Sequence, residues 1–465
     1  MNAPYSRVNQ TPQKIIRDAI ELCAGCDTCR TLMDEDCVFF PELYRLWDRE
    51  NEEGIPISEM ELRNLVELCT LCGLCPCPNI PADMMEAKSR YIDQEGLPLA
   101  VRLLTDVPRM ARICGTFPRL VNALQSSKTV GPLLRKLTRV HPERRLPSVP
   151  EQNFFQWAAK KGLTCRKEGT RNVAYFAGCT AGYLFPQVGR AVVEVLERNG
   201  INVYVPPQQC CGMPHFVEGN RTATLQRVRS NVEHLQESVQ SGEDLVCSCP
   251  TCGYFMKVLL KERAYYSEAY QRSVNAGKEE IKVPHPDLGV KKHMVLRKST
   301  YERILKDDSY FSSLDPMARI GLAEHLSDAG EYLARLHAEG RFDTNFNSIP
   351  ERMVYFAPCH QREQKIGSPY PDLLALIPGI TIEPVGGLDC CGMGGNFGFK
   401  VDFHDKSLAI GSPLMAKLRK QAPHAIVTDC MSCSLQFRHA LPYPVFHPMD
   451  ILARAYQTGD ARPAR

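Results

Sequence analysis

The 465-residue sequence has no long apolar run and almost no net charge. Because no stretch of 18 or more apolar residues occurs, the sequence predicts no transmembrane helix. The segment from Met1 to Gln13 is polar and lacks the charged and apolar regions of a secretory signal, which indicates an unexported, cytoplasmic chain. A net charge of +3, without basic motifs interleaved with aromatic residues, indicates no nucleic-acid partner.

The common catalytic and nucleotide-binding motifs are also missing. Neither a P-loop nor a Ser/His/Asp arrangement stands out. The glycine-rich segment 392–398 lacks G-x-G-x-x-G spacing and begins at a cysteine pair, so it is better interpreted as a loop around a metal cluster. Without a hydride acceptor, the chain cannot oxidise an organic alcohol by itself and must receive electrons from another protein.

Cysteine, in contrast, is abundant, and its 21 residues fall in tight groups. In a reducing compartment, grouped thiols bind metal or perform redox chemistry more often than they form disulfides. The first group has the spacing C-x2-C-x2-C with a fourth cysteine eight residues later, and the second has C-x2-C-x2-C-x-C. These cysteines are Cys23, Cys26, Cys29 and Cys37, then Cys69, Cys72, Cys75 and Cys77.

A tripled C-x2-C-x2-C favours a cubane [4Fe–4S] cluster, and in two-cluster ferredoxins the fourth ligand comes from the other motif. We therefore predict two cubane clusters, with Cys77 completing the first set and Cys37 the second. Neither fourth cysteine has the usual three-residue gap, so these two assignments are the weakest. The alternative is two structural zinc sites with four cysteines each.

The second half of the chain repeats itself. Tyr175 to Cys179 matches Tyr355 to Cys359, Cys210 to Met213 matches Cys390 to Met393, and the later C-x2-C motifs also match. The first two matches have the same offset along the chain and the third differs by a single position, which indicates a duplication. Short apolar runs at 172–177 and 201–205, with a helical period at 188–198, predict a parallel α/β sheet in each copy.

Each copy supplies a single cysteine, an adjacent pair and a C-x2-C, every one at the end of a predicted strand. The crevice beyond the carboxyl ends of parallel strands gathers ligands from separate loops. Five thiolates suit a polynuclear centre, and Gly212 and Gly392 would let the backbone approach it closely.

This pattern resembles the CCG-domain iron–sulfur proteins, a family that includes the B component of heterodisulfide reductase, the glycolate oxidase iron–sulfur subunit and the C component of anaerobic glycerol-3-phosphate dehydrogenase. Two ferredoxin-type motifs before two CCG domains is the layout of the last of these, and His141 to Pro147 looks like its linker. The resemblance implies a cubane or non-cubane [4Fe–4S] cluster in one or both copies. By position, the two ligand sets are Cys179, Cys210, Cys211, Cys249 and Cys252, and Cys359, Cys390, Cys391, Cys430 and Cys433.

The predicted fold is α+β. We expect a helical ferredoxin-type domain at 1–96, a basic helical region and linker at 97–170, the first α/β CCG domain at 171–260, a helical connector at 261–350 and the second CCG domain at 351–465. Region 97–145 has ten Lys or Arg against two acidic residues, with helices broken near Pro108, Pro118 and Pro132. This basic region could lie on an anionic membrane surface or pack against a partner.

Three cysteines and several histidines remain. Cys247 is an alternative to Cys249, although the repeat register favours Cys249. We expect Cys114 and Cys165 to be buried and apolar rather than ligands, and His215, His360, His404 and His439 to form hydrogen bonds near the clusters.

The resemblance implies an electron-transfer subunit. It would relay electrons from an FAD-dependent dehydrogenase, acting on glycerol 3-phosphate or a 2-hydroxy acid, to quinone at the inner face of the cytoplasmic membrane. The alternative is a disulfide or heterodisulfide reductase with non-cubane clusters.

Overall fold

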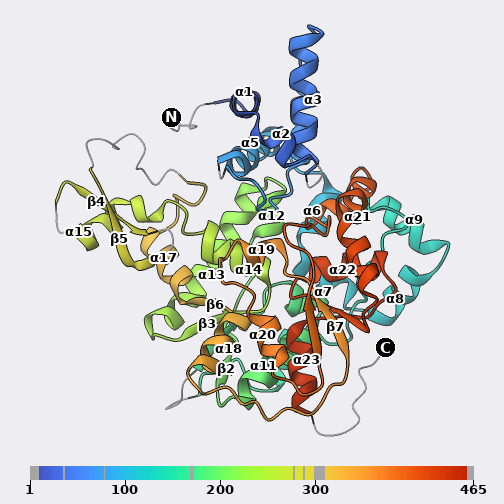
Figure 1. The fold of residues 1–465 in the computed structure, drawn as a ribbon, viewed down its shortest axis with the longest axis vertical. Coiled ribbons are helices and arrows are strands. Elements are labelled where there is room, and N and C mark those ends of the chain that lie inside the picture. Colours follow the sequence, from blue (N-terminus) through green and yellow to red (C-terminus); the bar gives the residue numbers. More distant parts are fainter. Residues whose placement is uncertain are drawn as a thin grey trace.

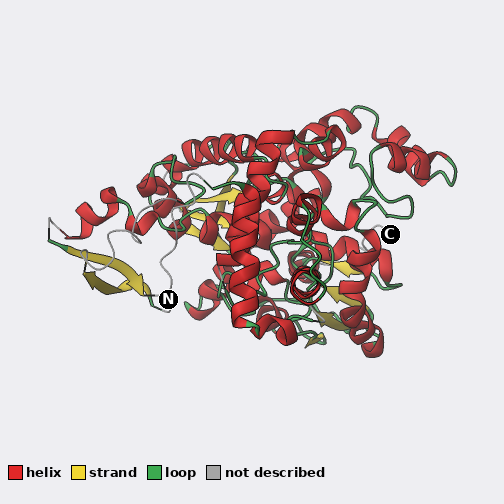
Figure 2. Cartoon of the chain, turned by 90° about the horizontal axis from the view of Figure 1, so that it is seen from above, coloured by secondary structure: helices red, strands yellow, loops and turns green. Residues whose placement is uncertain are grey.

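A helical N-terminal part lies over two parallel β-sheets, and Figure 1 shows its helices at the top of the molecule. This computed structural model describes residues 10–34, 37–77, 79–167, 172–275, 278–285, 288–297 and 309–457. Helices surround both sheets, which Figure 2 draws in yellow as separate groups. The α+β class predicted from the sequence is therefore confirmed.

Two of the N-terminal helices, α1 and α4, begin where a polar cap precedes an apolar face. The Thr11 side chain accepts a hydrogen bond from the Lys14 backbone N–H at the start of α1, and Ser58 and Glu61 form a reciprocal capping box at the start of α4. The apolar faces then pack together in one core. These helices are α1 (Pro12–Cys26), α2 (Thr28–Leu32), α3 (Phe39–Glu52), α4 (Glu59–Glu67) and α5 (Asn79–Glu95).

The basic region forms short helices, and its prolines lie in first helical turns as expected. Proline is tolerated there because that backbone nitrogen has no partner within the helix. None of the helices among the described residues has the length and apolar character needed to cross a bilayer. The helices are α6 (Leu99–Thr105), α7 (Val107–Cys114), α8 (Pro118–Ser126), α9 (Val130–Leu137) and, after the linker, α10 (Phe154–Lys160).

The first sheet is parallel throughout and has the strand order β2-β1-β3-β6. Residues 173–176 of its central strand are fully buried, as in parallel sheets covered by helices on both faces. Its strands are β1 (Asn172–Phe176), β2 (Asn202–Tyr204), β3 (Asp244–Cys247) and β6 (Leu326–Asp328). The surrounding helices are α11 (Pro186–Arg198), α12 (Met213–Val217), α13 (Arg221–Gln240), α14 (Pro250–Gly253), α17 (Pro316–His325) and α18 (Ala329–Ala338), with π-helical turns η2 (Thr180–Leu184) and η3 (Tyr254–Leu259).

The second sheet repeats this topology with the order β8-β7-β9-β10, also parallel. Each strand corresponds to one in the first sheet, which supports the duplication inferred from the cysteines. Its strands are β7 (Arg352–Tyr355), β8 (Thr381–Pro384), β9 (Ala425–Val427) and β10 (Val445–Phe446). Its helices are α19 (Cys359–Arg362), α20 (Pro369–Ala375), α21 (His404–Gln421), α22 (Met431–Ala440) and α23 (Pro448–Tyr456).

The connector at 261–350 is less helical than the sequence indicated. Besides α15 (Glu268–Asn275) and two helices of the first repeat, it contains the antiparallel pair β4 (Glu280–His285) and β5 (Gly289–Arg297), at the left of Figure 1. Ile281 and Val283 are buried while residues between them are less so, which is the two-residue period of a strand. The connector also supplies β6, so the first repeat draws its last strand from beyond residue 260.

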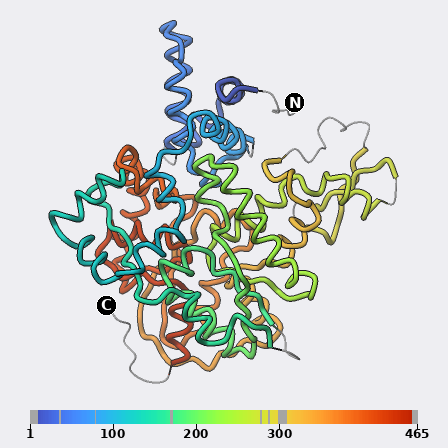
Figure 3. The backbone as a smooth tube through the Cα atoms, turned by 180° about the vertical axis from the view of Figure 1, so that it is seen from behind, coloured from blue at the N-terminus to red at the C-terminus, as the bar shows by residue number. Residues whose placement is uncertain are grey.

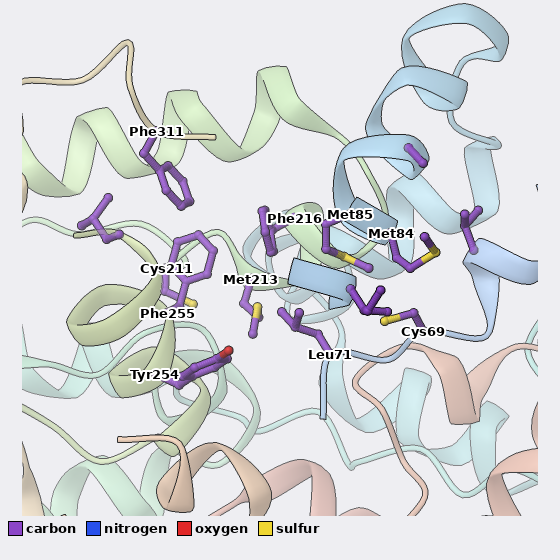
Figure 4. Close-up of a cluster of buried hydrophobic side chains, with 14 of the residues drawn as sticks. Cys69, Leu71, Met84, Met85, Cys211, Met213, Phe216, Tyr254, Phe255 and Phe311 are labelled. Atoms are coloured by element: carbon purple, nitrogen blue, oxygen red, sulfur yellow. The ribbon is translucent and has the colours of Figure 1, made fainter. Parts of the chain in front are cut away.

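The N-terminal part packs directly against both repeats. Figure 4 shows Leu71 and Met85 beside Met213 and Phe216 of the first repeat, in one continuous apolar core. Lys400 of the second repeat forms ion pairs with Glu218 of the first at 2.6 Å and with Glu67 of the N-terminal part at 3.5 Å. These contacts position the three cysteine-bearing parts relative to one another.

Candidate metal centres

The eight N-terminal thiols form two sets. In each set the fourth cysteine comes from the other motif, as the sequence predicted. Burial, and then the thiols of Cys29 and Cys77, raise the pKa of Cys23 to about 12. Burial and then Cys72 likewise raise the pKa of Cys37 to about 12. Cys77 therefore lies with the first motif and Cys37 with the second.

The five cysteines of the first repeat converge at the carboxyl ends of its strands. The Sγ atoms of Cys179 and Cys210 are 3.3 Å apart, and the Cys252 thiol interacts with those of Cys211 and Cys249. All five side chains are buried. The structure thus brings together the set that the repeat register selected.

The second repeat forms the equivalent set, with the Sγ atoms of Cys391 and Cys433 at 3.1 Å. The Cys359 thiol lies within electrostatic reach of Cys391 and Cys430. Gly392, after the cysteine pair, has φ of +81°, and a Cβ there would collide with the Ser407 carbonyl oxygen of α21. In this structure glycine is therefore required because the backbone at Gly392 lies close to the backbone of α21.

The two repeats share one cavity of about 880 Å³. Apolar residues of the basic region and linker, among them Val107, Met110 and Phe155, close its other side. The cysteines that line it are Cys72, Cys179, Cys211, Cys249, Cys252, Cys359, Cys390, Cys391, Cys430 and Cys433, with Cys114 at its wall.

The donor set of this cavity fits iron–sulfur clusters. Burial, followed by repulsion from neighbouring thiolates, raises the pKa of Cys359 well above its usual value, and burial and neighbouring thiols also raise that of Cys75. Such thiols become stable thiolates when bound metal cations compensate their charge. Soft thiolate ligands select zinc, copper(I) or iron–sulfur clusters, and five per site exceed the four that a zinc ion takes.

The second N-terminal set lies against the second repeat. Cys72 interacts electrostatically with Cys359 and Cys390, and a small cavity is lined by Cys37, Cys69, Cys72, Cys75 and Cys390. His360 links the same parts because its Nε2–H donates to the Leu71 carbonyl oxygen at 2.9 Å, while its Nδ1 accepts from the Thr251 hydroxyl at 2.9 Å. Burial lowers the pKa of His360, so the ring is neutral, as this pairing requires.

The other predicted neighbours behave differently. His215 is buried, yet among the described residues its ring forms no hydrogen bond, so the expectation was wrong for it, whereas the buried His404 ring interacts with the Gly398 backbone. His404 stacks on His141 with 3.8 Å between ring centroids, and His439 packs edge-on against His404.

The three remaining cysteines lie in different parts of the fold. Cys165 is exposed, so its predicted burial was wrong: it lies in the short segment between α10 and β1 rather than in a core. Cys114 is half-buried at the wall of the shared cavity. Cys247 ends strand β3, where its thiol faces the Cys249 carbonyl and Asp328.

Replacing Cys249 by Ser is expected to remove the iron bound by the first repeat, whereas Cys247→Ser should retain it. The reason is that Cys249 interacts with Cys179 and Cys252, while the Cys247 thiol faces the Cys249 carbonyl oxygen and Asp328. Iron per chain after anaerobic purification of both variants measures this, and equal iron loss in the two would contradict the assignment of Cys249.

Comparison with known proteins agrees with this geometry. The cysteine-rich domain CCG matches twice, at residues 173–257 and 353–438, which are the two repeats. The C component of anaerobic glycerol-3-phosphate dehydrogenase from Escherichia coli (strain K12) is 24% identical over 355 residues, covering 76% of this chain and 76% of the relative.

Two archaeal proteins are also similar. An uncharacterized iron–sulfur protein of Methanocaldococcus jannaschii is 23% identical over 406 residues, covering 87% of this chain and 63% of the relative. The B component of fumarate reductase (CoM/CoB) from Methanothermobacter marburgensis is 24% identical over 274 residues, covering 58% and 42%. The chain thus carries two copies of the cysteine-rich CCG domain and is related to the C component of anaerobic glycerol-3-phosphate dehydrogenase.

Proposed function

We propose that this chain is the electron-transfer subunit of an oxidoreductase. It holds two cubane [4Fe–4S] clusters on the eight N-terminal cysteines and one cluster, cubane or non-cubane, on each five-cysteine set. Such clusters take up and release single electrons. The partner is an FAD-dependent dehydrogenase subunit for glycerol 3-phosphate or a 2-hydroxy acid, and the acceptor is the quinone pool.

The observation that carries this proposal is the unbroken series of thiol sets through the molecule. Cys75 interacts with Cys29 of the outer set, Cys72 with Cys359 of the second repeat, and both repeats line the same cavity. The series begins at the surface, where Cys26 and Cys77 are exposed. Support for the partner comes from the similarity to a subunit of a glycerol-3-phosphate dehydrogenase.

Helices α8 and α9 support a place at the inner face of the cytoplasmic membrane. They project from the body of the molecule, at the left edge of Figure 3. Phe117 is 66% exposed, and Leu133 and Leu137 are 58% and 72% exposed. Because Arg112, Arg119 and other basic residues flank these apolar side chains, the surface suits the interface of an anionic bilayer.

The test of function compares two acceptors. The anaerobically purified chain, reduced with dithionite, is expected to pass electrons to a water-soluble quinone analogue far faster than to an organic disulfide. A relay needs only that its clusters lie near one another, whereas a reductase must bind a disulfide in an open cavity and split it at a cluster. Stopped-flow absorbance of the reduced chain measures both rates.

The alternative is a disulfide or heterodisulfide reductase, and one observation favours it: all five cysteines of the second set and four of the first line a single cavity. Rapid disulfide cleavage that is lost in Cys211→Ser or Cys391→Ser protein would place the chemistry in this chain and contradict the relay.

A further inference from the structure

Arg144 is a fully buried arginine beside the second five-cysteine set. Its side chain is 0% exposed, its guanidinium lies 5.4 Å from the Phe399 ring centre, and one of its amino groups contacts the Met393 sulfur. Met393 follows Cys391 by two residues, and Arg144 interacts electrostatically with the Cys391 thiol.

This guanidinium lacks a carboxylate partner for its charge among the described residues. Within that part of the chain its Nε and Nη1 atoms form no hydrogen bond, and no Asp or Glu side chain forms an ion pair with it. The neighbouring Glu143 is exposed. Arginine keeps its proton at neutral pH, so the buried guanidinium carries a positive charge. A buried, unpaired cation is costly unless an anion lies next to it.

The nearby histidines do not share this charge. Burial, Arg144 and His404 lower the pKa of His439 to about 4, and burial together with His141 lowers that of His404. Both rings are therefore neutral at pH 7. The fixed positive charge beside Cys391 comes from Arg144, because Arg145 is exposed and donates to the Arg438 carbonyl oxygen.

The first repeat has no equivalent charge at the matching positions. Arg144 belongs to the single linker and reaches only one of the two sets. A second arginine, Arg362, interacts electrostatically with Cys359. The register that aligns Cys359 with Cys179 aligns Arg362 with Gly182, so the first repeat has no charge at this position. The first repeat instead has the buried His215 beside Cys210, and the ring of this histidine forms no hydrogen bond among the described residues.

We propose that Arg144 is a potential-setting residue that makes the second five-cysteine set the higher-potential site of the two repeats. This inference rests on the proposed clusters. The potential of an iron–sulfur cluster depends on its net charge, on hydrogen bonds to its sulfurs and on solvent exposure. A buried cation with unpaired N–H groups stabilises the reduced cluster, which carries the more negative charge, and so raises its potential. Electrons that arrive from the N-terminal sets therefore collect at the second repeat.

The test replaces Arg144 by Met, Gln and Lys in the full chain. Met removes charge and donors, Gln retains donors without charge, and Lys retains the charge. Arg145→Met is the matched control, since it removes an exposed arginine from the adjacent position. The readout is the midpoint potential of each EPR signal in an anaerobic redox titration, with iron and sulfide content measured on the same samples. Signals are assigned by their loss in Cys211→Ser and Cys391→Ser protein.

In Arg144→Met, the midpoint of the second-repeat signal is expected to fall while the first-repeat signal stays unchanged. Lys should shift it least, and Arg145→Met should leave it at the wild-type value. An unchanged midpoint in Arg144→Met protein with full iron content would overturn the inference. If Arg144→Met protein loses iron at this site, the midpoint potential of Arg144→Gln protein is used instead. An unchanged value there would likewise overturn the inference. Wild-type protein without sulfide would instead refute the clusters themselves.

Discussion

Replacing Cys391 by Ser is expected to abolish the centre of the second repeat while leaving the N-terminal centres intact. Cys391 is 5% exposed, and its Sγ atom lies 3.1 Å from that of Cys433, so its loss breaks the middle of this set. The N-terminal thiols lie on α1 and α2, just before α3 and on the loop after α4, in a separate part of the chain. One cluster's share of iron and sulfide should disappear, together with one EPR signal.

Cys165→Ser is the matched control because Cys165 is exposed and belongs to none of the thiol sets. It should retain all iron, sulfide and signals. Disappearance of the ferredoxin-type signal from folded Cys391→Ser protein would contradict the separation of the sites. Stoichiometric zinc with negligible sulfide in the wild-type protein would contradict the assignment of iron–sulfur clusters.

The thiol sets of the repeats were predictable because the duplication is visible in the sequence. Matching the second C-x2-C, which begins at Cys430, against the first selected Cys249 over Cys247. The structure agrees, since Cys249 interacts with Cys179 and Cys252. Parallel strands then carry each group to the same edge of a sheet, so strand order was enough to predict their convergence.

Contacts between distant segments were not predictable in the same way. Nothing in the spacing of Cys72 indicates that its loop lies against Cys390, because this contact depends on how the N-terminal helices pack on the repeats. Strand β6 is separated from β3 by a long connector, and its three residues are too short for a periodic signal.

The burial of Arg144 also could not be predicted from the sequence. A basic residue in a proline-rich linker usually indicates a solvated segment, and its neighbours Glu143 and Arg145 are exposed. Only the packing of this linker against Met393 and Phe399 buries the guanidinium. Composition alone therefore could not distinguish this buried arginine from its exposed neighbours.

Removing Cys72 is expected to interrupt electron transfer between the surface and the two repeats. Cys72 belongs to the set that interacts with Cys29 on one side, through Cys75, and it interacts itself with Cys359 on the other. The repeats lie behind it, with most of their thiols buried. A reduced small ferredoxin cannot enter the shared cavity as a whole protein, so it should donate electrons at the exposed end, near Cys26 and Cys77.

In Cys72→Ala protein we therefore expect reduction of the repeat-bound centres by this ferredoxin to slow by orders of magnitude. Reduction by dithionite, which is small enough to reach every site, should keep its wild-type rate. Freeze-quench EPR after rapid mixing measures both, and Cys165→Ala is the control because it changes an exposed thiol outside the sets. If the variant lacks the EPR signal of the centre that includes Cys72 and still shows wild-type rates with ferredoxin, electrons enter the repeats directly. The thiol sets would then not act in series.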